Sequence, residues 1–414
     1  MKPKPRPEIL MVEFFSRGGL YHYALQLALA LARQGHTITL LTARHPEIVP
    51  AEHAPGFGFA PRLWTWNPRQ SGGRPALGRR VIHAARYVVM WLQILWWALR
   101  LRPVALLFGD FEHRCDAWFC ALLLAAGSTV ADVCHNVISF DRHSDSRLLR
   151  QERWRDRLLG RLDCVFAHGV VLADQLRRRT GRQAVAIPHG AGELCMRAAG
   201  PDPDLRARLQ LPPPTPVALM FGTLTKYKGI EWLLDALAAV PPAVRPYLVI
   251  AGFPAADAKL EAWQARGGRL GLDACVRWVP EYVPWPQVAW YFRLASFIVL
   301  PYYQASQSGV AHLALSFGRA LIVSAAGALP DVVTPGINGL VVPVRDIAAL
   351  AQAIERLSAD GKLCQAMGRQ GAAMAVHRHD WDEIARLVGR ELTAKRNGAG
   401  APRKRPPPQP LARR

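Results

Sequence analysis

Short apolar runs alternate with longer amphipathic stretches along most of the chain. Near its beginning, Glu8–Phe15 (EILMVEFF) is an apolar run that predicts a buried strand. Gly19–Gln34 carries apolar residues at helical spacing, and Gly35 and His36 separate it from a second apolar run, Thr37–Thr42. A strand, a helix and a strand in this order predict a parallel sheet with right-handed crossover connections.

The alternation is interrupted once and then resumes. Arg197–Pro216 is rich in Pro, Asp and Gly, which predicts a linker that holds one short helix. We therefore expect an α/β protein with two sheets of similar size and a cleft between them. Further strands are predicted at 104–108, 129–133, 164–167 and 184–187 before the linker, and at 217–222, 247–252, 276–280, 297–302, 320–324 and 339–343 after it.

These patterns divide the chain into five segments. Residues 1–196 and 217–378 are predicted to be Rossmann-like domains, joined by the linker at 197–216. Residues 379–396 contain a final amphipathic helix. Residues 397–414 form a basic, Pro-rich tail that we expect to be disordered, because it has few apolar residues to bury.

Composition narrows the classes of protein. Half of the 414 residues are apolar and 20% are charged, as in globular domains with large cores. The formal net charge of +21 attracts polyanions, although Arg also accumulates in GC-rich genomes. No RNA- or DNA-binding motif accompanies the charge, so nucleic acid is not the expected partner. The seven Cys residues are scattered without a CxxC pair, which predicts no metal centre, no disulfide and a reducing cytoplasm.

One apolar run stands out from the others. Tyr87–Leu99 (YVVMWLQILWWAL) is bounded by Arg86 and Arg100 and is too short to span a bilayer, which needs about 20 apolar residues. Its tryptophans and basic flanks favour contact with an anionic membrane surface. The alternative is an ordinary buried helix.

Two loops in the first half carry candidate chemistry. Such loops at the carboxyl ends of parallel strands are where ligands bind in open α/β sheets. Ser16–Gly19 contains two glycines before a helix, which allow a phosphate to approach the backbone, although a tight turn explains them equally well. His135 follows a predicted strand and could bind a sugar hydroxyl, or it could be a structural histidine.

Two more such loops lie in the second half. Lys226 and Lys228 lie between a strand and a helix and predict a diphosphate site, against the alternative of a solvated basic turn. Ser306–Val310 (SQSGV) spans a predicted helix start whose N–H groups could hold an anion, or whose serine is a simple N-cap. Gly327 precedes a further predicted helix.

Beyond these patterns, the chain from about Leu10 to about Leu392 resembles the GT-B glycosyltransferases, in particular the retaining nucleotide-sugar enzymes of family 4. The resemblance rests on the order and spacing of several segments. They are RGGLYHYALQLALALARQGHTITLLT, VCHNV, VAIPHGAGE, MFGTLTKYKGIEWLLDAL, VPEYVPWPQVAWYFRLASFIVLPY, SQSGVAHLALSFGRALIVSAAGALPDVV, GINGLVVPVRD and HDWDEIARLV. It implies an acceptor-side first domain, a nucleotide-sugar-binding second domain and a final helix that crosses back onto the first domain.

The resemblance also assigns site residues. It implies that His135 contacts the donor sugar and that Lys228 neutralises the diphosphate, and we take these two as the catalytic residues. The nucleobase would meet Glu281, Tyr282 and Val283, mainly through backbone groups. Arg17 and His189 are weaker candidates for the acceptor side. Further residues implied on the donor side are Gly18, Gly19, Lys226, Gln304, Ser306, Gln307, Ser308, Gly309, Val310 and Gly327.

The chain departs from the family pattern at two glutamates. Aligned on Gly318, their positions hold Ala305 and Leu313. Gln304 or Gln307 could replace the first glutamate near the transferred sugar, and the ribose contact of the second must be lost or replaced. The Arg that usually follows the second-domain strand is Thr223 here, and Lys226 could supply its charge. The Ser-Gln-Ser-Gly-Val sequence resembles a variant found in sugar transferases of surface-polysaccharide assembly.

The expected function is hexosyl transfer from a nucleoside diphosphate sugar to a glycan or lipid-linked acceptor, with retention. It requires no cofactor and no metal ion, since the sequence has no DxD-like pair at a strand end. The expected location is the cytoplasm, at the inner face of the plasma membrane. The alternatives are a non-catalytic sugar-nucleotide-binding subunit, which the two missing glutamates favour, and a sugar-nucleotide epimerase, which would need carboxylates in the cleft.

Overall fold

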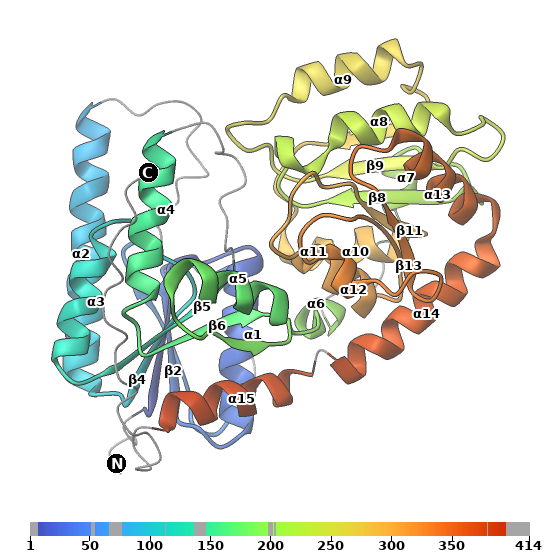
Figure 1. Ribbon diagram of the computed structural model, residues 1–414. Helices are drawn as coiled ribbons and strands as arrows, with labels where there is room; N and C mark the ends of the chain where they lie inside the picture. The colour runs from blue at the N-terminus through green and yellow to red at the C-terminus, as the bar shows by residue number, and fades with distance from the viewer. Residues whose placement is uncertain are drawn as a thin grey trace.

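The computed structural model describes residues 7–50, 54–65, 77–111, 113–135, 146–197, 202, 204–378 and 380–394. These residues form two lobes that lie side by side, each built on one parallel sheet with helices on both faces (Figure 1). The predicted arrangement of two parallel-sheet domains is therefore confirmed. The tail predicted to be disordered from residue 397 lies outside the described residues.

The N-terminal sheet has seven parallel strands in the order β3-β2-β1-β4-β5-β6-β7. Strand order reverses beside β1, which lies between β2 and β4, and such a reversal opens a crevice at the carboxyl ends of the strands. The strands are β1 (Ile9–Glu13), β2 (Ile38–Ala43), β3 (Phe57–Leu63), β4 (Ala105–Phe108), β5 (Thr129–Cys134), β6 (Cys164–His168) and β7 (Val185–Ile187).

Helices cover both faces of this sheet because the strands alternate large apolar residues between them. One face packs against α1 (Gly19–Arg33) and the C-terminal helix α15 (Trp381–Thr393). The other face packs against α2 (Leu77–Leu101), α3 (Asp116–Ala125), α4 (Ser146–Leu159) and α5 (Val170–Thr180).

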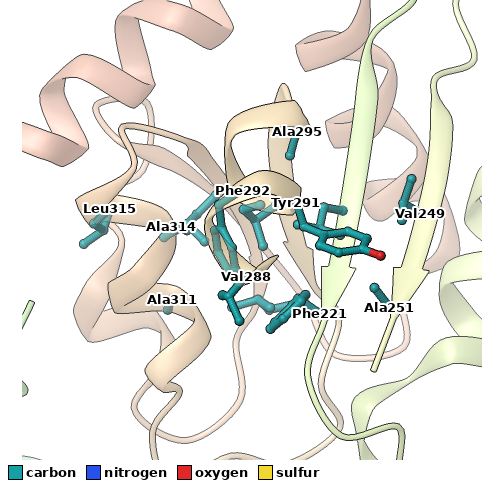
Figure 2. Close-up of a cluster of buried hydrophobic side chains, with 14 of the residues drawn as sticks. Phe221, Val249, Ala251, Val288, Tyr291, Phe292, Ala295, Ala311, Ala314 and Leu315 are labelled. Carbon is teal, nitrogen blue, oxygen red and sulfur yellow. The ribbon is translucent and has the colours of Figure 1, made fainter. Parts of the chain in front are cut away.

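The second sheet has six parallel strands in the order β10-β9-β8-β11-β12-β13, and its order reverses beside β8. Figure 2 shows part of the core under one face, where β8 and β9 meet α10 (Trp285–Leu294) and α11 (Gly309–Ser316). Phe221 comes from β8, Phe292 from α10 and Ala314 from α11. This core fixes the start of α11 against the sheet. The strands are β8 (Val217–Phe221), β9 (Tyr247–Ala251), β10 (Val276–Val279), β11 (Phe297–Leu300), β12 (Ala320–Ser324) and β13 (Gly339–Val342).

The remaining helices complete the second lobe and the connections. Helices α8, α9, α13 and part of α14 cover the face opposite α10 and α11. The bounds are α6 (Glu193–Arg197), α7 (Leu205–Arg208), a 3₁₀ turn η2 (Lys226–Lys228), α8 (Ile230–Ala239), α9 (Leu260–Arg269), α10 (Trp285–Leu294), α11 (Gly309–Ser316), α12 (Leu329–Val332), α13 (Ile347–Ala359) and α14 (Gly361–Arg378).

The last helix returns to the first lobe. The chain leaves the C-terminal lobe through α14, and α15 lies beside α1 under the N-terminal sheet (Figure 1). The indole Nε1 of Trp381 donates to the carbonyl of Ala191 at 2.8 Å, and Arg33 pairs with Asp382 at 2.9 Å. Because this helix packs into the core of the other lobe, it ties the two lobes together.

Strand β3 and helix α14 are among the elements that were not predicted from the sequence. Strand β3 contains Pro61, which interrupts its apolar pattern. The strand lies at the sheet edge, where a residue without a backbone N–H donor is tolerated. Helix α14 contains three glycines that dilute its helical periodicity. Among the described residues, no helix is long and apolar enough to cross a bilayer.

Candidate active site

A cavity of about 770 Å³ lies between the two lobes. The N-terminal lobe lines it with the loop after β1, the start of α1, His135 after β5 and residues 189–192 after β7. The C-terminal lobe lines it with the loops after β8 and β10 and with the start of α11. These segments follow the carboxyl ends of strands, which is where an open parallel sheet binds its ligands.

Lys228 is a buried cation on the C-terminal wall. Its side chain is 5% exposed, and Nζ donates to the carbonyl of Phe221 at 3.2 Å. Burial lowers the pKa of Lys228 to about 7, since a low-dielectric environment disfavours the charged amine. Gly222 permits this position, because a Cβ there would approach Nζ to 3.0 Å. A lysine desolvated in this way gains strongly from a bound anion.

The start of α11 faces the same cavity. Ser308 is its N-cap, and its hydroxyl makes no capping hydrogen bond within the helix. Gly309 and Val310 follow as the first helical residues and line the cavity. The N–H groups of a first helical turn and the helix dipole favour a negative charge at this point. Lys228 and this helix start therefore offer a positive corner to an anion.

Across the cavity, Gly18 and Gly19 open helix α1. Gly18 has φ +83°, and no other heavy atom lies within 4 Å of an added Cβ at either glycine. Both glycines line the cavity. Neither glycine places a side chain between the backbone and the cavity, although the Gly18 N–H donates to the Glu47 carboxylate at 3.3 Å. The left-handed φ of Gly18 explains why a glycine occupies that position.

His135 lies deeper in the cavity wall, 3% exposed. Burial, with a smaller contribution from His189, lowers the pKa of His135 to about 3, so its imidazole is neutral at physiological pH. Its Nδ1 lies 3.2 Å from Nε2 of His168. His189 continues this group and stacks on His312 of the other lobe, with ring centroids 4.3 Å apart and planes 4° from parallel. The histidines thus form a contact between the lobes.

Outside the cavity lining, Glu47 joins the two lobes. It comes from the loop after β2, and its carboxylate accepts hydrogen bonds from the hydroxyl of Tyr282 at 2.8 Å and the backbone N–H of Trp285 at 2.7 Å. It also contacts His22 Nε2 at 3.0 Å and Gly18 N at 3.3 Å. Burial raises the pKa of Glu47, but hydrogen bonds from His22, Trp285 and Tyr282 outweigh it and bring the pKa to about 2.

Residues 215–360 match the family model of the glycosyl transferases group 1. This region contains Lys228, the 281–283 loop and the start of α11. Over 240 residues, the chain is 33% identical to the D-inositol 3-phosphate glycosyltransferase of Streptomyces bingchenggensis, a match that covers 56% of this chain and 52% of that protein. The corresponding protein of Streptomyces avermitilis is 32% identical over 248 residues, 58% of this chain and 53% of that one. The chain thus spans about half the length of the curated relatives it matches.

Solved structures share the whole fold. Sucrose-phosphate synthase from Thermosynechococcus elongatus has a TM-score of 0.73 at 23% identity, over 95% of this chain and all of that one. Anabaena HepE in complex with UDP-glucose has a TM-score of 0.68 at 17% identity, over 93% and 99%. The predicted GT-B fold is therefore confirmed.

The two positions where the resemblance predicted glutamates hold apolar residues, Ala305 and Leu313. Leu313 packs against residue 192, where an added Cβ on Gly192 would approach Leu313 Cδ2 to 2.4 Å. The Gly192 N–H also donates to Ser316 Oγ at 2.9 Å. Ala305 is 8% exposed. Both positions thus hold apolar side chains, so neither offers a polar group to a ligand.

The structure brings most of the predicted residues together in one cavity. Lys226 is an exception. Its side chain is exposed and lies outside the cavity lining, because residues two apart on a 3₁₀ turn point in different directions. Its backbone N–H donates to the Asp257 carboxylate at 2.9 Å. The predicted residues that line the cavity are Arg17, Gly18, Gly19, His135, His189, Lys228, Glu281, Tyr282, Val283, Gln307, Ser308, Gly309 and Val310.

Three other predicted contacts also lie outside the lining. Gln304 is half-buried beyond it, and Ser306 is 3% exposed within the protein. Gly327 has φ +54°, and a Cβ there would come within 1.5 Å of the Ala305 carbonyl. We therefore assign Gly327 to close backbone packing against Ala305, in the loop before α11, rather than to ligand contact. We assign buried Ser306 to the packing of the same loop.

Several cavity or interface residues were not predicted. Glu47 stands in a segment that carries no motif, whereas Tyr23 and His312 lie in segments that carry the family resemblance but gave these two residues no role. Only the meeting of the two lobes gives the three residues a role. His168 could have been found, because it ends the strand next to the one that His135 follows. In the described part of the chain, no group of three or more His, Cys, Asp or Glu side chains is arranged to hold a metal ion.

Proposed function

We propose that this protein is a glycosyltransferase that moves a hexosyl group from a nucleoside diphosphate sugar. The observation that carries the proposal is buried Lys228, which faces the same cavity as the start of α11 and Gly18–Gly19. These groups suit a diphosphate, and the family match covers the lobe that holds two of them. Anabaena HepE, which shares the fold, was solved with UDP-glucose.

In the proposed reaction, negative charge develops on the β-phosphate as the glycosidic bond to the leaving group breaks. Lys228 and the first turn of α11 stabilise this charge in a site that largely excludes water. The donor sugar extends toward His135 and Gln307, and the nucleoside toward Glu281–Val283. We propose transfer with retention and without a metal ion, and Arg17 and His189 as contacts on the acceptor side.

A specific observation favours a second candidate, a non-catalytic sugar-nucleotide-binding subunit. Leu313 and Ala305 fill two positions where family 4 enzymes carry glutamates, and Leu313 contacts the opposite lobe at Gly192. Such a subunit would use the same anion corner for binding only. Release of nucleoside diphosphate separates the two candidates, since the subunit binds the donor and releases nothing. Glu281 is a carboxylate in the cavity lining, but it belongs to the loop proposed for the nucleobase, so the epimerase has less support than either candidate.

We further propose that the acceptor is glycan or lipid-linked and lies at an anionic membrane surface, for surface-polysaccharide assembly at the inner face of the plasma membrane. Helix α2 exposes an apolar stripe at helical spacing, and Trp118 and Leu122 of α3 are exposed as well. A groove of about 540 Å³ along α2 is lined by Arg44, Arg62 and Trp96, among others. Guanidinium and tryptophan together suit anionic headgroups. The exposed stripe comprises Val81, Val88, Leu92, Trp96 and Leu99.

The donor screen tests the enzymatic part. Purified protein is incubated with each common UDP-, GDP- and ADP-sugar, with and without membrane lipid extract, and free nucleoside diphosphate is measured. We expect release that depends on lipid extract with one donor and disappears in Lys228→Ala. Lys226→Ala serves as the matched control, since its side chain lies outside the cavity. Binding without release across the whole screen would support the non-catalytic subunit instead.

Vesicle sedimentation tests the membrane part separately. We expect the double variant Leu92→Asp, Trp96→Asp to bind vesicles containing anionic lipid at least about tenfold more weakly. Each substitution puts a charge in place of apolar area that the membrane would bury. Its nucleotide binding should be unchanged, since α2 lies away from the cavity lining. Equal binding of both proteins to these vesicles would contradict the assignment of this surface.

A further inference from the structure

The groove along α2 is separate from the cavity between the lobes. Arg44 and Arg62 supply its charge, and both side chains are exposed. Neither arginine forms an ion pair in the part of the chain that the structure describes. Two guanidinium groups therefore stand beside a mostly apolar surface without a carboxylate to neutralise them. The other residues that line the groove are Val89, Leu92, Gln93, Trp96 and Trp97.

An irregularity in strand register brings the two arginines to the ends of neighbouring strands. In the parallel pair β2–β3, residues 42 and 43 align with Pro61 and Leu63, so Arg62 is an extra residue, as in a β-bulge. Arg44 comes directly after β2, and its backbone N–H donates to the Leu63 carbonyl at 3.2 Å. Such an extra residue changes the direction of a side chain and is frequent on edge strands beside binding sites.

Aromatic and amide contacts hold this edge against α2. The Arg44 guanidinium lies over the Trp64 ring, with Cζ 4.5 Å from the ring centroid. The Trp64 N–H donates to Oε1 of Gln93 at 2.9 Å, and Nε2 of Gln93 donates to the Arg62 carbonyl at 3.4 Å. A guanidinium that stacks on a ring keeps its N–H groups at the edge, where they can bind a phosphate in bidentate fashion.

We propose that this groove binds the diphosphate end of the lipid that carries the acceptor glycan. The diphosphate lies against Arg44 and Arg62, and the adjoining hydrocarbon chain lies against Leu92 and Trp96 of α2. Charge complementarity favours this occupant. A diphosphate that joins a lipid to a glycan carries two negative charges, which match two unpaired guanidinium groups, whereas the phosphodiester of phosphatidylglycerol carries one.

The position of the groove suits an acceptor. Arg44 and Glu47 belong to the same connection between β2 and β3, and three residues span at most about 10 Å. Glu47 in turn accepts a hydrogen bond at 2.8 Å from Tyr282, which lines the cavity. A glycan that extends from the groove along this connection reaches the cleft. The inference rests on the proposed function for the role of this lipid as acceptor, but binding of a lipid diphosphate does not depend on catalysis.

The first test is calorimetric titration with farnesyl diphosphate, which joins a short apolar chain to a diphosphate. The protein carries Lys228→Ala, so that the anion corner of the cavity does not compete for the probe. We expect binding that Arg44→Ala or Arg62→Ala weakens at least about tenfold, because each removes a charge-assisted, bidentate contact. The matched control is Arg161→Ala, an exposed arginine of the same lobe outside the groove lining, which should change affinity less than about twofold.

Two outcomes of this titration would overturn the proposal. One is the absence of binding, and the other is an equal loss in all three arginine variants, which would show a general attraction to positive charge. Arg44→Lys adds a sharper criterion, since it keeps the charge and removes the planar fork. We expect it to weaken binding about three- to tenfold, and an unchanged affinity would contradict bidentate recognition. The thermal midpoint should be the same in all variants, because the substituted side chains are exposed.

The second test separates a lipid diphosphate from an ordinary anionic lipid. Phosphatidylcholine vesicles contain either a polyprenyl diphosphate or phosphatidylglycerol, matched in total charge, and sedimentation measures binding. We expect the wild-type protein to bind the first kind at least about fivefold more tightly and Arg44→Ala to lose this preference. Equal binding of the wild-type protein to both kinds would overturn the proposal. If no donor yields free nucleoside diphosphate, the proposed function fails, and both binding tests still decide what the groove holds.

Discussion

The two lobes meet the cavity with different kinds of groups. The C-terminal lobe presents backbone N–H groups at the start of α11, bare Gly222 and one cation, Lys228. Besides the backbone of Gly18 and Gly19, the N-terminal lobe presents side-chain rings, among them Tyr23 and His135. An anion of fixed geometry is best held by backbone groups, whereas hydroxyls of a variable sugar or acceptor are read by side chains. The family match at 215–360 falls in the lobe whose part of the cavity depends on backbone.

The largest effect should come from the one buried cation of that corner. We expect Lys228→Ala to weaken nucleoside diphosphate binding at least about 30-fold, because loss of a buried charge partner costs about 2–5 kcal/mol. Lys226→Ala should change it less than about twofold, since that exposed side chain lies outside the cavity. Calorimetric titration measures both. Similar losses in the two variants would mean that the anion is not held in the cavity.

The pH dependence of donor binding is the next effect in size. Burial brings the pKa of free Lys228 to about 7, and a bound diphosphate raises it. Lys228 is already charged below pH 7, so affinity is highest there. Above pH 7 each binding event takes up a proton, and affinity falls by up to about tenfold per pH unit.

Titration of a nucleoside diphosphate sugar from pH 6.5 to 8.5 measures this slope, because both phosphates of such a donor stay ionised throughout. Calorimetry at pH 8 in buffers of different ionisation enthalpy counts the protons taken up. The slope should disappear in Lys228→Ala. An affinity that does not change with pH in the wild-type protein would show that Lys228 remains charged without ligand. It would follow that water reaches Lys228 and the start of α11.

Glu47 tests whether the two lobes act as one site. It bonds Tyr282 and Trp285 across the cleft, so we expect Glu47→Gln to weaken donor binding about three- to tenfold through loss of charge-assisted hydrogen bonds. Small-angle scattering should show a more open molecule. In a double-mutant cycle, Tyr282→Phe should add little to Glu47→Gln, and full additivity would argue against this contact in solution.

The Glu47 carboxylate also predicts how the stability of the folded protein changes in acid. The pKa of Glu47 in the folded protein is about 2, below its usual value of 4.5. Its contribution to folding is therefore present above about pH 4.5 and is lost as the pH falls toward 2. Between pH 5 and 8 the contact should not titrate.

The smallest expected effect belongs to the ring side of the cavity. The Tyr23 hydroxyl is buried and has no hydrogen-bond partner among the described residues, so Tyr23→Phe should leave the free energy of unfolding within about 0.5 kcal/mol. If the hydroxyl binds a ligand, kcat/KM for the donor or acceptor falls about three- to tenfold. Denaturant unfolding and steady-state kinetics distinguish the two. An unchanged kcat/KM would remove Tyr23 from the N-terminal lobe's recognition of hydroxyls.

Local pattern accounts for how well particular elements were predicted. The strand and helix at 9–33 are set by apolar spacing and by the glycines before α1, so their sequence predicts them directly. Lys228 and the Ser308–Val310 helix start were predicted because strand-to-helix loops concentrate ligand contacts. Strand β3 and helix α14 were missed because Pro and Gly interrupt their periodicity, and tertiary packing compensates for the interruption.

The sequence by itself determined the two parallel sheets and the cleft between them, because periodicity and loop position are local properties of the chain. Only the tertiary structure decided which of two lysines enters the cavity and which faces solvent. It also decided that Glu47 meets Tyr282, 235 residues away, and that His189 stacks on His312. Such contacts depend on the packing of one lobe against the other, and no spacing along the chain encodes that relation.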